Sequence, residues 1–259
     1  MKTIRALLSL ALSSCMLPGC ASLPPPQRTS LAQACELYST GDSAVAGRQL
    51  DAIIQQYPNA DEIAEAHYVR GLCRMKSEQL ADAAADFQAA VEKSRREELT
   101  ARSEASLAAV AYRQGEWGKA AELYETALQN LPPDASPDEV AFSAGVALQR
   151  AGRWKDAALQ FGRVIRTFPN SSVAAQAHRL VSWPHEYFTI QLAVYANSDQ
   201  ASAAVESYKT KGVDAYVESM SHEQRIVWVV MTGKHPTYDE AQTGSKRVQQ
   251  IEPKAVTLP

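Results

Sequence analysis

The chain has 259 residues, of which 46% are hydrophobic and 21% are charged, and this length allows two domains with ordinary buried cores. Its formal net charge is −3 and it has no block of Lys and Arg, so the sequence predicts no nucleic acid partner. A mildly acidic surface repels phosphate, and this leaves neutral sugars, peptides or proteins as the expected ligands.

Residues 1–19 have the pattern of a secretory signal peptide. Two basic residues precede an apolar run over residues 6–12, which is too short to be a permanent membrane span. The segment Leu17-Pro18-Gly19-Cys20 then resembles a bacterial lipobox, in which the cysteine thiol receives diacylglycerol. Pro18 departs from the small residue that is usual there. Cys20 is therefore the predicted lipidation site, with acyl chains such as palmitate as the membrane anchor.

Two alternatives to Cys20 remain open at this point. Leu12-Ser13-Ser14-Cys15 also fits the lipobox pattern, and an ordinary signal peptide would leave the cysteines unmodified. Neither Cys15 nor Cys20 is followed by aspartate, the residue that retains such lipoproteins in the inner membrane of enteric-type bacteria. The resemblance thus implies an outer-membrane lipoprotein that faces the periplasm. Residues 20–30 would carry the lipid and form a short extended tether.

Cys35 and Cys73 are the two other cysteines, and two states are open for them. In an oxidising periplasm they could form a disulfide. Each also stands where a small apolar residue would pack between helices, as a buried thiol does.

Residues 31–182 are rich in alanine and repeat with a period of 37 residues. Alanine recurs at this spacing, a large apolar residue follows four positions later, and a small residue stands twelve positions before the alanine. Glycine and then an aromatic residue recur between the small residue and the alanine, and proline closes three of the four units. These positions are Ala46, Ala83, Ala120 and Ala157; Leu50, Phe87, Tyr124 and Phe161; Ala34, Gly71, Ala108 and Gly145; Gly41, Gly115 and Gly152; Trp117 and Trp154; and Pro58, Pro132 and Pro169.

Such offsets predict pairs of antiparallel helices that approach closely at the small residues. The pattern resembles the tetratricopeptide repeat, lengthened from 34 to 37 residues and without the leading Trp of that family. The resemblance implies a scaffold whose concave face binds peptides or an envelope protein that the sequence does not identify. Tyr57-Pro58-Asn59 and Phe168-Pro169-Asn170 also resemble repeats of periplasmic proteins that coordinate outer-membrane constriction or assembly, although a proline that stops a helix explains the same residues.

Residues 184–259 form a second domain of mixed composition. Apolar alternation, β-branched runs and helix caps predict the order βαββαβ. Thr237 and Glu240 form a capping box at the start of the second helix. The expected elements are strand Phe188–Tyr195, helix Ser198–Lys211, strand Asp214–Met220, strand Ile226–Thr232, helix Tyr238–Ile251 and strand Lys254–Leu258.

The two halves of this domain also correspond to each other forty residues apart. Ile190-Gln191-Leu192-Ala193-Val194-Tyr195 corresponds to Val230-Met231-Thr232-Gly233-Lys234-His235. This arrangement resembles the sporulation-related repeat (SPOR) domain, which binds septal peptidoglycan. The resemblance implies an antiparallel four-stranded sheet with both helices on one face and glycan strands without stem peptides on the other. The predicted fold class is therefore α + α/β, a tetratricopeptide-type array followed by a small SPOR domain.

Strand alternation predicts which side chains lie on the open face of the sheet. Phe188, Ile190, Leu192 and Val194 would face the helices, and the opposite residues of this strand, together with residues of the third strand, would contact glycan. An amide supplies directed donors and acceptors to sugar hydroxyls, and apolar surfaces stack on pyranose rings. Gln191 is the first-ranked contact because it matches the recurring strand glutamine of the family. The predicted glycan-binding residues are Thr189, Gln191, Ala193, Tyr195, Val229 and Met231.

Several residues of this domain are ambiguous or depart from the family pattern. Trp228 has the parity of a core residue, and Tyr195 could cap the sheet edge instead. Ala193 replaces a glycine of the family, and Lys254 replaces an aromatic residue, so both put the glycan affinity in doubt. His185-Glu186 is interpreted as a linker feature.

Catalytic and metal-binding motifs are not found in the sequence. The five histidines are scattered, and there is no His-x-x-x-His, Cys-x-x-Cys, Gly-x-Ser-x-Gly or phosphate-loop spacing. The prediction is a non-enzyme without a cofactor that binds denuded glycan at the division septum and a protein on its repeats. The alternative is a tetratricopeptide scaffold for outer-membrane assembly or constriction whose end domain binds nothing.

Overall fold

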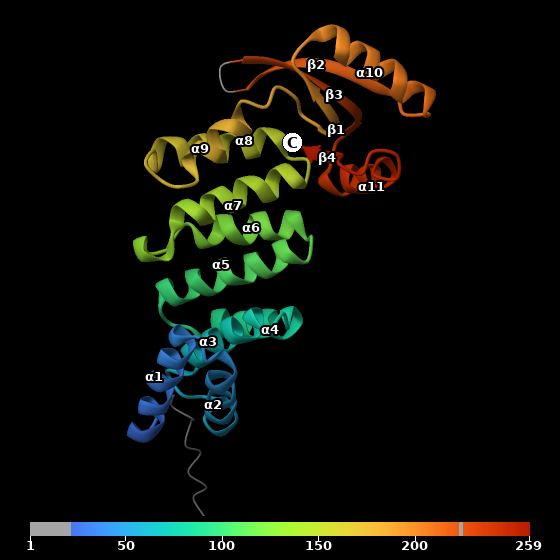
Figure 1. The fold of residues 1–259 in the computed structure, drawn as a ribbon. Coiled ribbons are helices and arrows are strands. Elements are labelled where there is room, and N and C mark those ends of the chain that lie inside the picture. Colours follow the sequence, from blue (N-terminus) through green and yellow to red (C-terminus); the bar gives the residue numbers. More distant parts are fainter. Residues whose placement is uncertain (1–21, 223–224) are drawn as a thin grey trace, which may run out of the picture.

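The 37-residue repeats form pairs of antiparallel helices. The computed structural model describes residues 22–222 and 225–259. Within them, nine α-helices stack in chain order into an elongated array (Figure 1). They are α1 (Pro25–Thr40), α2 (Ser43–Gln56), α3 (Ile63–Lys76), α4 (Leu80–Lys93), α5 (Glu97–Arg113), α6 (Trp117–Ala127), α7 (Pro137–Arg150), α8 (Trp154–Thr167) and α9 (Ala174–Val181), with a 3₁₀ turn (Pro133–Ala135) before α7. The pairs α1/α2, α3/α4, α5/α6 and α7/α8 are the four predicted repeats.

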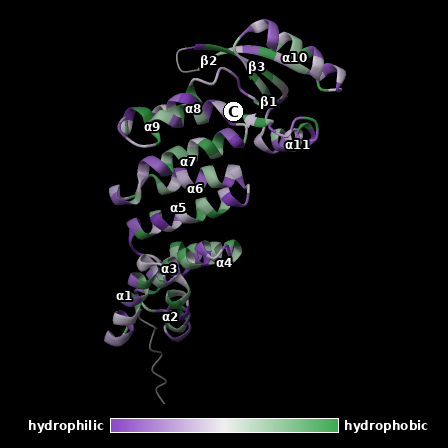
Figure 2. Cartoon of the chain, in the orientation of Figure 1, coloured by the Kyte–Doolittle hydropathy of each residue, from purple (hydrophilic) through white to green (hydrophobic). Residues whose placement is uncertain are grey.

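The periodic alanines lie where the paired helices touch. None of them is more than 1% exposed: Ala46, Ala83, Ala120 and Ala157. In the second and fourth repeats, a glycine faces the ring that follows the alanine. A Cβ atom at Gly71 would lie 2.7 Å from the Phe87 ring, and one at Gly145 would lie 2.6 Å from the Phe161 ring. Helices that bury one side carry hydrophobic and hydrophilic residues together, as Figure 2 shows along the array.

The turn inside each repeat contains a residue with left-handed backbone geometry. Gly115 and Gly152 have φ angles of 79° and 80°, which glycine adopts without a steric penalty. In the second repeat Glu78 takes this position with φ of 60°, at a cost of about 1 kcal/mol relative to glycine. Trp117 and Trp154 begin the second helix of their repeats two residues after the glycine.

A buried charged cluster joins the first two repeats. Asp86 of α4 is 2% exposed, and its carboxylate accepts hydrogen bonds from His67 Nδ1 at 3.0 Å, Arg70 Nε at 3.0 Å and Arg74 Nη1 at 2.7 Å. Arg70 Nη1 also donates to Asp51 of α2 at 2.7 Å. Burial acts to raise the pKa of Asp86, but the hydrogen bonds from His67 and Arg70 and the charges of Arg70 and Arg74 hold that pKa below its ordinary value. The cluster therefore links α2, α3 and α4 through a charged carboxylate.

The start of the array differs from the expected extended tether. Residues 25–30 belong to α1, which Pro25 begins because proline is well suited to the first turn of a helix. Leu23 is 1% exposed within the core of the first repeat, and its backbone N–H donates to Glu62 Oε2 at 2.8 Å. The tether prediction is thus wrong from Ser22 onward. The signal peptide and both candidate lipidation sites, Cys20 and Cys15, lie outside the described residues.

Cys35 and Cys73 are free thiols. Cys73 of α3 is buried and Cys35 of α1 is half-buried, both in the core that α1, α2 and α3 share. Burial raises the pKa of both thiols, so both stay protonated. The structure therefore agrees with the alternative of two packed thiols.

The end domain has the predicted βαββαβ order. Its elements are β1 (Phe188–Tyr195), α10 (Ser198–Thr210), β2 (Ala215–His222), β3 (Arg225–His235), α11 (Tyr238–Val248) and β4 (Val256–Leu258). All strand pairs are antiparallel, in the order β2-β3-β1-β4. Asn197 caps α10 by accepting the backbone N–H of Gln200, and Thr237 caps α11 as predicted. Both helices pack on one face of the sheet, over a core that includes Ile190 and Val230.

An aromatic seam joins the two domains. We use this name for Arg150, Trp117 and Trp154 of the array with Phe188 and Tyr238 of the end domain. The Trp154 and Phe188 rings have centroids 4.7 Å apart, and Trp117 meets Tyr238 edge to face at 5.7 Å. The Arg150 guanidinium lies over the Tyr238 and Trp117 rings at 4.3 and 4.7 Å, as a cation–π contact.

Two indole N–H groups fix the end domain on this seam. Trp154 Nε1 donates to the Pro236 carbonyl oxygen at 3.2 Å, and Trp117 Nε1 donates to Asp239 Oδ1 at 3.1 Å. Both acceptors flank the start of α11. As a result the end domain sits beside the ends of α6, α7 and α8 (Figure 1).

Candidate functional site

The candidate site is the face of the sheet that is turned away from α10 and α11. Cross-strand partners share a face, and Gln191 of β1 pairs with Met231 of β3, which pairs with Tyr216 of β2. Val229 of β3 pairs in the same way with Glu218 of β2. These residues form the open face, and the predicted Gln191, Val229 and Met231 are among them.

A bulge in β1 changes the rest of the predicted set. The register of β1 on β3 shifts by one residue between Gln191 and Ala193, so two residues of β1 stand opposite one residue of β3. Beyond this shift Val194 pairs with Val229 on the open face and is 48% exposed. Tyr195 pairs with Trp228, and both rings pack against the core under the helices.

The predicted faces of Ala193, Val194 and Tyr195 are therefore wrong. Strict alternation placed Ala193 and Tyr195 on the open face and Val194 under the helices, and the bulge reverses all three. Trp228 is a packing residue, in line with its core parity.

Thr189 lies on the open face but is not accessible. It is completely buried, and its hydroxyl is 2.9 Å from the Tyr216 hydroxyl and donates to the Gly233 carbonyl oxygen at 2.9 Å. These bonds use its hydrogen-bonding capacity within the domain. Thr189 therefore positions Tyr216 rather than presenting a group to a ligand.

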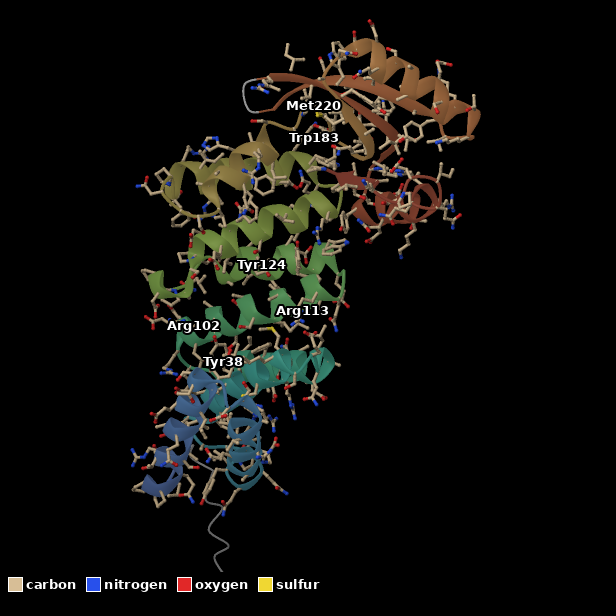
Figure 3. All side chains as sticks on the ribbon, in the orientation of Figure 1. Tyr38, Arg102, Arg113, Tyr124, Trp183 and Met220 are labelled. Atoms are coloured by element: carbon tan, nitrogen blue, oxygen red, sulfur yellow. The ribbon has the colours of Figure 1, made fainter. Side chains whose placement is uncertain are left out.

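The segment Trp183–Tyr187 lies across the open face, and we call it the strap. His185 Nε2 and Glu218 Oε2 are 2.8 Å apart, which places the His185 ring on this face. The Tyr187 ring stacks on that of His185 at 4.6 Å, and Lys234 Nζ lies over both the Tyr187 and the Tyr216 rings at 5.2 and 5.4 Å. Trp183 lies between the sheet and the last helices of the array (Figure 3), and its Nε1 donates to the Tyr187 carbonyl oxygen at 3.1 Å.

The strap divides the open face into a covered and an uncovered part. On the covered part, Val229 and Met231 are 3% and 0% exposed, and both lie on the face turned away from α10 and α11. The uncovered part is a strip of Gln191, Val194 and Val256, with Gln191 half-buried and Val256 paired to it from β4. None of the three carries a charge, so the strip offers an amide and apolar surface.

Sequence reasoning missed the strap and the seam. The signal was present, because Trp183, His185, Tyr187 and Phe188 place four rings within six residues, a density unusual for a solvated linker. His185-Glu186 was interpreted as a linker feature, and the structure assigns His185 to the sheet face and leaves Glu186 exposed.

A second candidate site is a groove along the helical array. A cavity of about 610 Å³ is lined by Tyr38 of α1, Tyr68 of α3, Arg102 of α5 and Tyr124 of α6, among others. Burial raises the pKa of Tyr68, and burial raises that of Tyr124 to about 12, so both hydroxyls remain protonated. Arg102 Nη2 donates to Asp134 Oδ1 at 2.6 Å at the edge of this groove.

The described residues supply neither a metal site nor a membrane-spanning helix. In residues 22–222 and 225–259 no three His, Cys, Asp or Glu side chains gather closely enough to hold a metal ion. No helix in the same ranges is long and apolar enough to cross a bilayer.

Comparison with protein families assigns both parts of the chain. Tetratricopeptide repeat models match residues 31–98, 74–140 and 139–171, and the SPOR domain model matches residues 184–257. These ranges coincide with the helical array and the end domain. No curated protein sequence matches the chain.

Several solved structures are similar to this chain, tetratricopeptide repeat proteins among them. A tetratricopeptide repeat protein from Parabacteroides merdae has a TM-score of 0.50 and 16% identity over 60% of this chain, and the match spans 58% of that protein. YrrB, described as having an unusual peptide-binding site, has a TM-score of 0.49 and 15% identity over 71% of this chain and 91% of its own. PilF of Pseudomonas aeruginosa has a TM-score of 0.48 and 14% identity over 88% and 92%.

Proposed function

Because this chain is a tetratricopeptide repeat protein that ends in a SPOR domain, we propose that it is a non-enzymatic lipoprotein that connects the outer membrane to peptidoglycan. SPOR domains bind peptidoglycan and tetratricopeptide repeats bind proteins. The ligand of the end domain would be glycan strands that have lost their stem peptides, which accumulate at the division septum. The array would bind a second protein of the cell envelope.

The uncovered strip of the sheet is the observation that carries the glycan proposal. Gln191 offers amide donor and acceptor groups to sugar hydroxyls or N-acetyl groups, and Val194 and Val256 offer apolar surface to a pyranose ring. The strip carries no charge, as suits a ligand stripped of its charged peptides. A neutral, partly apolar surface with one directed amide fits a sugar better than it fits phosphate.

Pelleting of the purified chain with amidase-treated and untreated sacculi tests the glycan ligand. We expect enrichment on the amidase-treated wall and weaker binding by Gln191→Ala. Gln200→Ala is the matched control, because Gln200 is exposed on α10, across the sheet from the strip. Equal binding to both kinds of sacculi would refute the preference for denuded glycan.

We further propose that diacylglycerol on Cys20 anchors the chain in the outer membrane, with Cys15 as the alternative site. Mass spectrometry of the N-terminal peptide from cells would identify the modified residue. Cys20→Ala should abolish lipidation and release the protein from the membrane fraction, and Cys15→Ala should leave both unchanged. The reverse result would assign the anchor to Cys15.

The groove of the array supports a second candidate function, a scaffold in which the end domain has no ligand. A cavity of about 610 Å³ gives the array a binding surface of its own, and much of the sheet face is covered. This alternative predicts that deletion of residues 184–259 leaves localisation and phenotype unchanged. The glycan proposal predicts that the deletion abolishes recruitment to the septum.

A further inference from the structure

We propose that the strap is an autoinhibitory segment that competes with glycan for the open face of the sheet. The inference rests on the proposed function, because it concerns the regulation of the same face. It starts from the covered part of that face, where Val229 and Met231 are almost completely buried although α10 and α11 pack on the other side. On this part of the face His185 of the strap meets Glu218, the cross-strand partner of Val229.

The strap contacts the sheet at the groups that a bound sugar would contact. The His185 ring meets the carboxylate of Glu218 at 2.8 Å. Lys234 of β3 lies over the Tyr187 and Tyr216 rings at 5.2 and 5.4 Å. Flat rings and hydrogen-bonding groups laid along a strand occupy the same surface that sugar rings with hydroxyl groups would occupy.

The strap is weakly held compared with the elements on either side of it. Trp183, His185 and Tyr187 are only half-buried, and Pro184 and Glu186 are exposed. Its hydrogen bond to the sheet, between His185 and Glu218, joins side chains that are 22% and 30% exposed. A segment with few buried contacts opens at a lower free energy than a core strand or helix. The strap can therefore leave the sheet while both domains stay folded.

Because only part of the open face is covered, we expect glycan to bind it in two steps. Gln191 and its neighbours on the strip are accessible while the strap is in place, so glycan first meets the β1–β4 edge. A strand of several sugars needs more of the face than this strip provides. Binding that extends over β3 and β2 then requires displacement of the strap. The apparent affinity for glycan is therefore the affinity of the open form multiplied by the fraction of molecules in which the strap is displaced.

Binding by full-length variants tests the competition. His185→Ala removes the hydrogen bond to Glu218 and leaves every sheet residue in place. We expect it to bind amidase-treated sacculi about five- to tenfold more tightly than the unmodified chain, as the loss of one charge-assisted contact from the covered state predicts. His178→Ala is the matched control, since His178 is exposed on α9, and it should bind like the unmodified chain.

Hydrogen–deuterium exchange of residues 183–187 provides the second readout. We expect their exchange to rise when amidase-treated glycan is added to the unmodified chain, and to be high without glycan in His185→Ala. Unchanged or weaker binding by His185→Ala, or increased protection of the strap by glycan, would overturn the inference, because the strap would then be neutral or part of the glycan site. Absence of binding by every variant, with exchange raised in His185→Ala, would instead refute the glycan function itself.

Discussion

Replacement of Asp86 by asparagine tests whether the charged cluster holds the first two repeats together. The substitution keeps the size of the side chain and removes its charge. Asp86 is 2% exposed and accepts hydrogen bonds from His67, Arg70 and Arg74. Removal of one partner of a buried ion pair costs about 3–5 kcal/mol, because the remaining charges stay buried without compensation. Arg70 keeps its bond to Asp51, so we expect a loss near the lower limit, about 3 kcal/mol.

Asp51→Asn is the matched control in the same cluster. The Asp51 side chain is 56% exposed, and a solvent-exposed ion pair contributes less than about 1 kcal/mol. Thermal unfolding followed by circular dichroism measures both variants. For a unit of this size we expect Asp86→Asn to lower Tm by about 6–12 °C. Equal losses for the two variants would refute the argument that burial makes the Asp86 contacts strong.

The pH dependence of stability follows from the lowered pKa of Asp86. In the unfolded chain an aspartate titrates near pH 3.9, above its value in the folded protein. The stabilisation is therefore complete above that unfolded value and is lost as the pH falls through the folded pKa. The difference in stability between the unmodified chain and Asp86→Asn should shrink below about pH 4. A difference that stays constant to lower pH would contradict this assignment.

Three further predictions concern packing and one side-chain hydrogen bond. Gly145→Ala should destabilise the array by about 1–2 kcal/mol, since overpacking against the Phe161 ring outweighs the better helix propensity of alanine. The double variant Gly145→Ala/Phe161→Leu should recover most of this loss, and unchanged urea unfolding of the single variant would contradict the close approach. Trp154→Ala should let the end domain separate from the array, seen as faster proteolysis between them, whereas equal cleavage rates would show that the seam is dispensable. Tyr208→Phe should cost about 1 kcal/mol in chemical denaturation through its lost hydrogen bond to Glu252, and no loss would show that this bond is not stabilising.

The array was predictable from sequence because its packing is local and repeated. Ala83 and Phe87 lie one helical turn apart, and the same pair returns at Ala157 and Phe161, so the periodicity reports the core directly. The βαββαβ order was predictable for the same reason, since caps and alternation are local signals. β1 has the bounds that were expected for it, Phe188–Tyr195.

The details of the site depend on contacts between distant residues, which local patterns do not encode. The bulge in β1 arises from how that strand pairs with β3, and a strand with alternating residues carries no mark of it. The strap is positioned by His185 meeting Glu218, 33 residues later in the chain. Gln191, Val229 and Met231 kept their predicted face because their pairing precedes the shift or lies on the partner strand.

The aromatic seam distinguishes the last two repeats from the first two. Trp117 and Trp154 occupy the same position in the third and fourth repeats, and the first and second repeats have Ser43 and Leu80 there. Helix pairing uses the alanines and the large apolar residues that all four repeats share, so the repeats are nearly equivalent as building blocks. Only the third and fourth repeats form the surface on which the end domain packs. Exchange of the first and third repeats would therefore preserve the stacking of helices but remove the contacts of Trp117 with Tyr238 and Asp239 of the end domain.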